Sequence, residues 1–126
     1  MLQFLRMPIA LLSKPNKSLQ AAGSICLAKV IQNASEELVG ALLDELTDKI
    51  CGIIRMSHFK SHSALLETLI SLIFHVEQKI EPFADKLLDI MLEQVKSDDS
   101  LTKKVSIDAI YALTAIIKEQ IVPFRF

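Results

Sequence analysis

Residues that interrupt helices or cross-link chains are scarce in this sequence of 126 residues, which has three glycines, four prolines, two cysteines and no tryptophan. So little glycine and proline argues against a fold of short strands and tight turns, because such folds need these residues at their turns. Two cysteines are too few for a disulfide-rich scaffold. Cys26 and Cys51 both fall in apolar helical patterns, and we interpret them as reduced thiols of an intracellular protein.

Neither sign of charge dominates, since the formal net charge is −1 and the isoelectric point is about 6.3. This balance gives no electrostatic basis for nucleic-acid binding. The longest apolar run, residues 64–76, is too short to span a membrane and contains Glu67 and His75. The run Met1–Leu12 could be misread as a signal peptide, but no convincing cleavage site follows it, and we interpret it as a helix. We therefore expect a cytoplasmic protein that does not enter membranes.

The residue patterns of enzymes and metal sites are also missing. His58 and His62 have the spacing of one helical turn, but Phe59 stands where a zinc protease would have its glutamate, and no further ligand is evident. We interpret these two as solvated histidines of a turn. The three glycines stand alone within helical patterns, where they favour close helix packing rather than phosphate binding. We expect no enzymatic activity, no cofactor and no metal.

What the chain does contain is apolar residues at helical spacing, with a hydrophobic content of 51% and a mean hydropathy of +0.37. After a first helix within residues 1–13, polar turns divide the pattern into expected helices at about 18–32, 36–55, 61–76, 82–96 and 101–117. Asn16 or Ser18 and Ser35 are suited to cap two of these helices, because their side-chain oxygens can accept backbone N–H groups.

Two similar phrases, at residues 77–83 and 119–124, place Pro-Phe pairs at Pro82 and Pro123, a spacing of 41 residues. A period near 40 built from helices is typical of HEAT and armadillo repeats. We therefore predict an all-α fold: an α-solenoid of HEAT-like antiparallel helix pairs, with about six helices and no strands. We call the first helix of each pair A and the second B.

The period predicts how the chain is divided. We expect residues 1–126 to form a single HEAT-repeat segment with the end of a preceding repeat at 1–13, repeats at 16–55 and 58–97, and a truncated repeat at 99–126. The repeats of a solenoid cover each other's apolar faces, so the outermost ones keep apolar surface exposed. Self-association through such surface is an expectation that follows.

Charge is distributed unevenly over the predicted helices. The starts of the A helices are basic, at Lys17, Lys60 and Lys103, whereas the B helices are acidic. A cation near a helix N-terminus opposes the helix dipole. We expect acids on adjacent helices to compensate these cations; the alternative is that the cations form a partner-binding ridge.

One segment has a more specific signal. The phrase Asn16-Lys17-Ser18-Leu19-Gln20, followed by Ile25-Cys26-Leu27-Ala28-Lys29, resembles the HEAT-repeat domain of the plant Tortifolia/Spiral microtubule-associated proteins, in which an N-K-S-x-Q phrase precedes a similar run. The likeness continues more weakly over residues 50–72 and at Leu101–Lys104.

This resemblance implies a TOG-like, non-enzymatic module that binds tubulin or microtubules, and hence a cytoskeletal location. In TOG-type domains the tubulin contacts come from the turns that join A to B helices. Here these turns span residues 33–37, 76–79 and 117–120, and the implied partner-binding residues are Asn33, Ser35, Glu36, Lys79 and Lys118. The same turns are rich in glutamate, so a generic HEAT/armadillo scaffold that binds a protein partner other than tubulin is the alternative.

Overall fold

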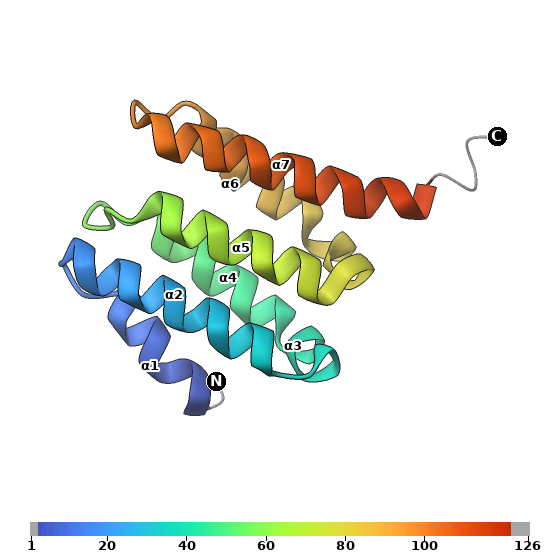
Figure 1. Ribbon diagram of the computed structural model, residues 1–126, viewed down its shortest axis with the longest axis horizontal. Helices are drawn as coiled ribbons and strands as arrows, with labels where there is room; N and C mark the ends of the chain where they lie inside the picture. Colours follow the sequence, from blue (N-terminus) through green and yellow to red (C-terminus); the bar gives the residue numbers. More distant parts are fainter. Residues whose placement is uncertain (1–2, 122–126) are drawn as a thin grey trace.

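The chain folds into two layers of helices, and the helices of one layer run antiparallel to those of the other (Figure 1). This computed structural model describes residues 3–121, and the side chains of residues 5–117. The elements in chain order are α1 (Gln3–Leu12), α2 (Lys17–Asn33), α3 (Glu36–Ala41), α4 (Leu43–Ile54), α5 (His62–Val76), the 3₁₀ helix η1 (Glu77–Phe83), α6 (Ala84–Val95) and α7 (Ser100–Ile121). No strand occurs among the described residues, and the fold is the predicted α-solenoid.

The A helices α2, α5 and α7 lie side by side in one layer, and the B helices α4 and α6 lie behind them (Figure 1). The most extensive contacts join α5 to α7, α1 to α2, and α2 to α5. Taking α3 with α4 as one interrupted B helix, and η1 with α6 as another, gives the predicted set of about six helices over residues 3–121.

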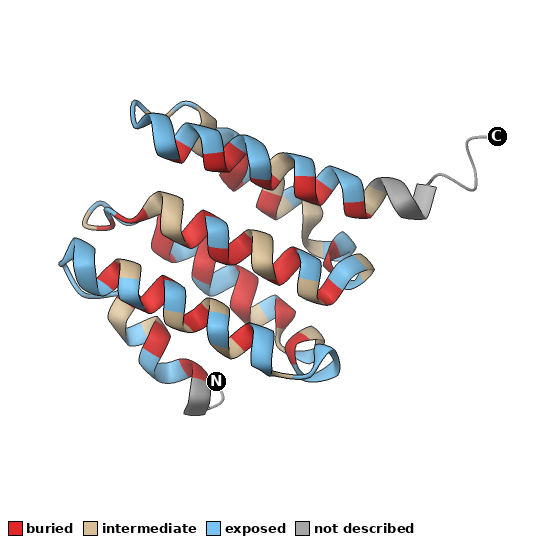
Figure 2. Cartoon of the chain, in the orientation of Figure 1, coloured by how far each residue is buried: buried red, intermediate tan, exposed pale blue. Residues whose placement is uncertain are grey.

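The core lies between the two layers, where both layers turn their apolar faces inward (Figure 2). Leu27, Leu65 and Leu69 are fully buried there, and burial of such a side chain is worth roughly 1.5–3 kcal/mol. Buried residues of α5 have buried counterparts in α7 at a constant shift of 40, close to the predicted period of 41. The pairs are Leu65 and Val105, Leu66 and Ser106, Leu69 and Ala109, Leu72 and Ala112, Ile73 and Leu113, and Val76 and Ile116.

The helix caps follow the sequence closely. Asn16 accepts the backbone N–H of Leu19 at 3.1 Å, and Ser35 accepts that of Leu38 at the same distance. Asp99, in the predicted stop before α7, accepts the N–H of Thr102 at 2.9 Å. Each side chain satisfies an N–H group that has no partner within its own helix.

The B helices differ from the prediction. The expected helix at 36–55 is interrupted at Leu42, whose N–H bonds to the carbonyl of Val39 in a tight three-residue turn (3.0 Å) that ends α3. Pro82 was expected in the first turn of an α-helix, but it lies in η1, and α6 begins only at Ala84. A 3₁₀ segment suits this place, because proline offers no N–H for the helical ladder.

Two of the glycines show how differently a lone helical glycine can be used. A Cβ atom on Gly23 would lie 2.9 Å from the Leu11 Cβ and 2.9 Å from the Pro8 carbonyl oxygen, so α1 rests directly on α2 here. The predicted role in close packing is therefore met at Gly23. It is wrong for Gly52, where an added Cβ would have no neighbour within 4 Å.

Candidate partner-binding edges

The turn between α2 and α3 holds two of the predicted partner-binding residues. Asn33 ends α2, and its side-chain amide donates to the Lys29 carbonyl at 2.8 Å. Ser35 caps α3. Both side chains are exposed, and their hydrogen bonds stay within the turn. They fix the shape of the turn and remain accessible from outside.

Glu36 and Lys79 come from consecutive repeats, and the fold brings them together. The Lys79 Nζ lies 3.8 Å from the Glu36 Oε1, with each side chain about half exposed. The stem of Lys79 crosses Gly40, where an added Cβ would approach the Lys79 Cδ to 3.1 Å. An exposed pair of this kind contributes up to about 1 kcal/mol. Its main consequence is spatial, because it joins the two A-to-B turns into one surface.

A second contact ties these turns together. The His75 Nε2 lies 2.9 Å from the carbonyl oxygen of Ala34, the residue that caps the C-terminus of α2. Beside it, Glu77 has a φ of 52° and a ψ of −125°, a conformation that residues with a side chain rarely adopt. This strained junction could not be predicted from the sequence, because a glycine would be the expected residue there.

Lys118 does not lie in a turn. α7 continues to Ile121, because Lys118, Glu119 and Gln120 are good helix formers and the next proline is Pro123. The expected turn at 117–120 is therefore wrong, and the side chain of Lys118 lies outside the described residues. We use the name A-to-B ridge for residues 33–37 and 76–79 only.

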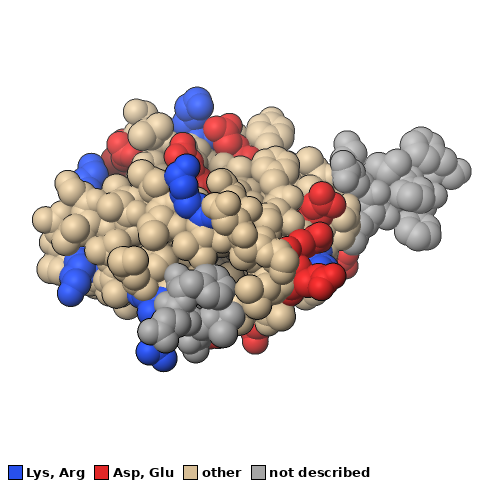
Figure 3. All heavy atoms as spheres, turned by 60° about the horizontal axis from the view of Figure 1, so that its bottom comes forward, with Lys and Arg blue, Asp and Glu red and all other residues tan. Residues whose placement is uncertain are grey.

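The A-to-B ridge is acidic. Glu36, Glu37 and Glu77 are exposed, and Lys79 is the one cation among its residues. Figure 3 shows acidic side chains gathered at the right-hand end of the molecule, over the turns that follow α2 and α5. Such a surface attracts basic partners and repels acidic ones.

The opposite edge, where each B helix leads into the next A helix, is organised by Gln20. This side chain is fully buried, and its Nε2 donates to the carbonyls of Lys14 (2.7 Å) and His58 (3.0 Å). Its Oε1 accepts the backbone N–H of Lys60 at 2.7 Å. The Ser61 hydroxyl adds a bond to the Lys17 carbonyl at 2.8 Å. Gln20 therefore fastens two consecutive loops, a role that the sequence interpretation missed although Gln20 ends the N-K-S-x-Q phrase.

The two histidines of this edge are not the solvated pair that was expected. The His62 ring packs edge-on against Phe59, with ring centres 5.2 Å apart, and burial lowers the pKa of His62. His58 is half-buried, and its Nε2 is buried without a hydrogen-bond partner in the described part of the chain. Over the same part, no group of three or more His, Cys, Asp or Glu residues could hold a metal ion.

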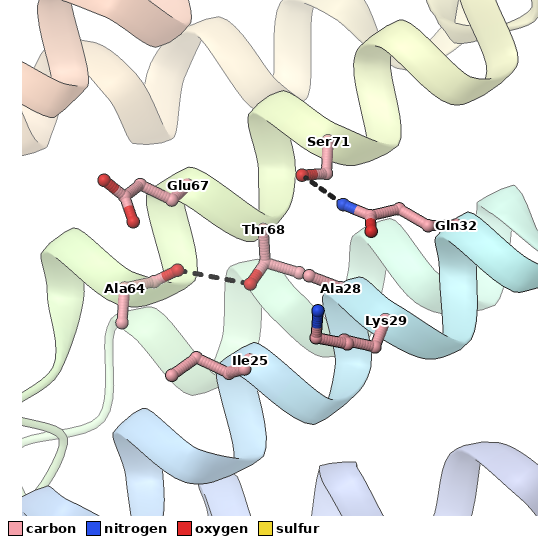
Figure 4. Close-up of a pocket in the computed structure, with 8 residues that line it drawn as sticks. All are labelled: Ile25, Ala28, Lys29, Gln32, Ala64, Glu67, Thr68 and Ser71. Atoms are coloured by element: carbon pink, nitrogen blue, oxygen red, sulfur yellow. Dashed lines mark hydrogen bonds between the residues drawn. The ribbon is translucent and has the colours of Figure 1, made fainter.

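A shallow groove of about 280 Å³ runs along the outer surface between α2 and α5 (Figure 4). Its lining residues are Ile25, Ala28, Lys29, Gln32, Ala64, Glu67, Thr68 and Ser71. Thr68 donates to the Ser24 carbonyl at 2.8 Å, and Gln32 reaches Ser71 at 3.4 Å. These bonds hold the two A helices together, so we assign the groove to the interface between consecutive repeats.

The fold and its two edges define an α-solenoid of stacked helix pairs, a class of proteins that presents extended surfaces to partners. No helix in the described part of the chain is both long and apolar enough to cross a membrane. The sequence model of the TORTIFOLIA1 N-terminal family matches residues 1–125, and the chain belongs to this family. The family is of a microtubule-associated type, which agrees with the resemblance seen around Asn16–Lys29. No curated protein and no solved structure matches the chain significantly.

Proposed function

We propose that this chain is a non-enzymatic protein-binding module of a cytoplasmic, microtubule-associated protein, and that the A-to-B ridge contacts tubulin. The observation that carries the proposal is membership of the TORTIFOLIA1 N-terminal family over residues 1–125. The exposed side chains of Asn33, Ser35, Glu36 and Lys79, drawn from two repeats, support the choice of surface.

Co-sedimentation with microtubules tests the proposal. The 126-residue chain should pellet with microtubules at low salt, and Lys79→Glu combined with Asn33→Ala should weaken pelleting because it removes contacts and adds repulsion towards an acidic surface. Lys49→Glu with Ser18→Ala is the matched control, since both residues are exposed and neither lies next to the A-to-B ridge. Absence of pelleting above background would refute the proposal.

The acidic character of the A-to-B ridge favours a second candidate, a scaffold that binds a basic protein other than tubulin. Charge reversal at Glu36, Glu37 and Glu77 should then abolish binding of that partner, because complementary charges would become like charges. The same variant should leave microtubule pelleting unchanged or improve it. If this variant no longer pelleted with microtubules, the acidic residues would be required for microtubule binding. The acidic surface would then give no support to a partner other than tubulin.

Self-association is a further part of the proposal. Ile25, Phe74 and Tyr111, one from each A helix, are 59%, 55% and 72% exposed, and exposed apolar groups on one layer favour contact between copies. Light scattering over a range of protein concentrations measures it. A constant monomer mass up to high concentration would contradict it.

A further inference from the structure

The loops that join each B helix to the next A helix form a basic edge, opposite the A-to-B ridge (Figure 1). Its exposed cations are Lys14, Lys17, Arg55, Lys60, Lys96, Lys103 and Lys104. The acids that lie among them are Glu93, Asp98, Asp99 and Asp108, and Asp108 pairs with Lys104 at 3.5 Å. Cations therefore outnumber acids here, although the whole chain carries a formal net charge of −1. The molecule is polarised along its helices, with a positive edge and a negative one.

Several of these cations have no partner of their own. Lys14, Lys60 and Lys103 form no ion pair with any described residue, so the expected compensation by acids on adjacent helices is not met for them. The pKa of Asp99 is lowered by the Thr102 hydrogen bonds first and by Lys17 only to a smaller extent. Lys17 opens α2, where its charge opposes the helix dipole. An anionic partner would relieve this unfavourable arrangement.

The backbone of the basic edge is fixed before any partner arrives. Gln20 bonds to the backbone of Lys14 and Lys60, and Ser61 bonds to that of Lys17. The backbones of Lys14, Lys17 and Lys60 are thus anchored to one buried side chain and one buried hydroxyl. Pre-organisation of this kind reduces the ordering cost of binding, which favours capture of a flexible ligand.

A cleft of about 550 Å³ opens within the basic edge, between the loop before α5 and the end of α6. Its polar side is formed by Arg55, Lys60, His62 and Glu93, and its exposed apolar group is Met56. Arg55 is already bound to Glu93, which leaves Lys60 as the free charge. Both charged and apolar side chains of an extended peptide therefore find complementary groups here.

We propose that the basic edge binds an extended acidic segment of a polypeptide, with Lys14, Lys17, Lys60 and Lys103 facing its carboxylates and the cleft beside Lys60 receiving one of its side chains. A nucleic acid fits less well. Single-stranded nucleic acids are held by aromatic side chains that stack on the bases, and Phe59 in the cleft is too deeply buried to do so. The inference rests on the proposed function, that of a protein-binding module. It adds the chemistry of the bound partner and a second surface that contacts this partner.

A fluorescein-labelled decaglutamate peptide is the probe, and its anisotropy with the 126-residue chain at low salt is the measurement. Binding should weaken at least about tenfold in the double variant Lys17→Glu/Lys60→Glu, and it should weaken steeply with salt in the unchanged chain. The control is Lys29→Glu/Lys49→Glu, which changes the net charge equally but lies outside the basic edge. The control should stay within about twofold of the unchanged chain.

Both substitutions in the edge variant place an acid near a helix N-terminus, which the helix dipole favours, so this variant should fold. Circular dichroism verifies the folding of the edge and control variants. Equal weakening in the edge and control variants would overturn the inference, as would tighter binding of oligo-deoxythymidine than of decaglutamate. Association between copies that depends on Lys17 and Lys60, without peptide binding, would overturn it too. If decaglutamate fails to bind while microtubules still pellet the chain, only this inference falls; if the peptide binds and microtubules do not, only the proposed function falls.

Discussion

The side-chain oxygen of Gln20, in the first turns of α2, accepts the backbone N–H of Lys60 at 2.7 Å, across a separation of 40 residues. One repeat is thereby fastened to the next by a polar side chain that is fully buried. Solenoid repeats are held together mainly by apolar contacts between neighbours. This bond adds direction to those contacts, because it specifies which loop lies against which.

Gln20→Ala should destabilise the fold by about 2–3 kcal/mol, since it leaves the Lys14 carbonyl, the His58 carbonyl and the Lys60 N–H without their partner. Urea unfolding followed by circular dichroism measures the change. The control is Gln32→Ala, because Gln32 is exposed and makes one long bond of 3.4 Å to Ser71. Equal midpoints for the two variants would show that the Gln20 bonds contribute little.

Gly23 and Gly52 provide a matched pair of substitutions within helices. Gly23→Ala should destabilise by about 1–3 kcal/mol, because the new methyl group collides with the backbone of α1 near Pro8. Gly52→Ala should stabilise by up to about 1 kcal/mol, because it adds helix propensity where no atom is displaced. Thermal unfolding gives both values. The same sign for both variants would be inconsistent with the direct contact of α1 and α2.

The ion pair of Arg55 and Glu93 predicts a dependence of stability on pH. The side-chain hydrogen bond from Arg55 lowers the pKa of Glu93 below the ordinary value of 4.5. A lowered folded-state pKa means that the stabilisation is complete above the unfolded-state pKa and is lost as the pH falls through the folded-state one. Both side chains are about half exposed, so solvent screening limits the contribution to about 1 kcal/mol or less.

Arg55→Met removes the charge and keeps the length of the side chain. Its midpoint of urea unfolding should fall below that of the unchanged chain at pH 7, and the difference should shrink towards zero as the pH is lowered well below 4.5. Lys103→Met serves as the control, because Lys103 has no ion pair among the described residues. A difference that persists at low pH would assign the effect of Arg55 to packing.

The architecture could be read from the sequence because its signals are local and repeated. Apolar spacing defined the helices, and the two Pro-Phe pairs gave a period of 41 that the shift of 40 between buried residues of α5 and α7 nearly matches. The cap residues Asn16 and Ser35 were also predictable, since each acts on its own helix. The break at Leu42 was not, because leucine is a good helix former and nothing in the local sequence marks a turn there.

The candidate surfaces were only partly predictable. The A-to-B turn at Asn33–Ser35 followed from helix ends, and the third turn failed because α7 continues past Lys118. The ion pair of Glu36 with Lys79 and the hydrogen bond of Gln20 with Lys60 each join residues about one repeat apart. Both contacts therefore depend on the register in which the repeats stack. The cations themselves could be read from the sequence. Whether each has an ion-pair partner depends on how the adjacent helices pack, which no local pattern specifies.

The two cysteines should differ in reactivity although both fall in apolar helical patterns. Cys51 is buried, and this burial raises the pKa of its thiol, whereas Cys26 is half-buried. A disulfide reagent such as DTNB at pH 8 should therefore modify Cys26 first, and Cys51 at least about tenfold more slowly, because the thiolate is the reactive form and must also be accessible. Cys26→Ala should leave only the slow reaction, Cys51→Ala only the fast one, and urea should make both fast. Equal rates in the folded protein would place Cys51 nearer the surface than the packing of α4 implies.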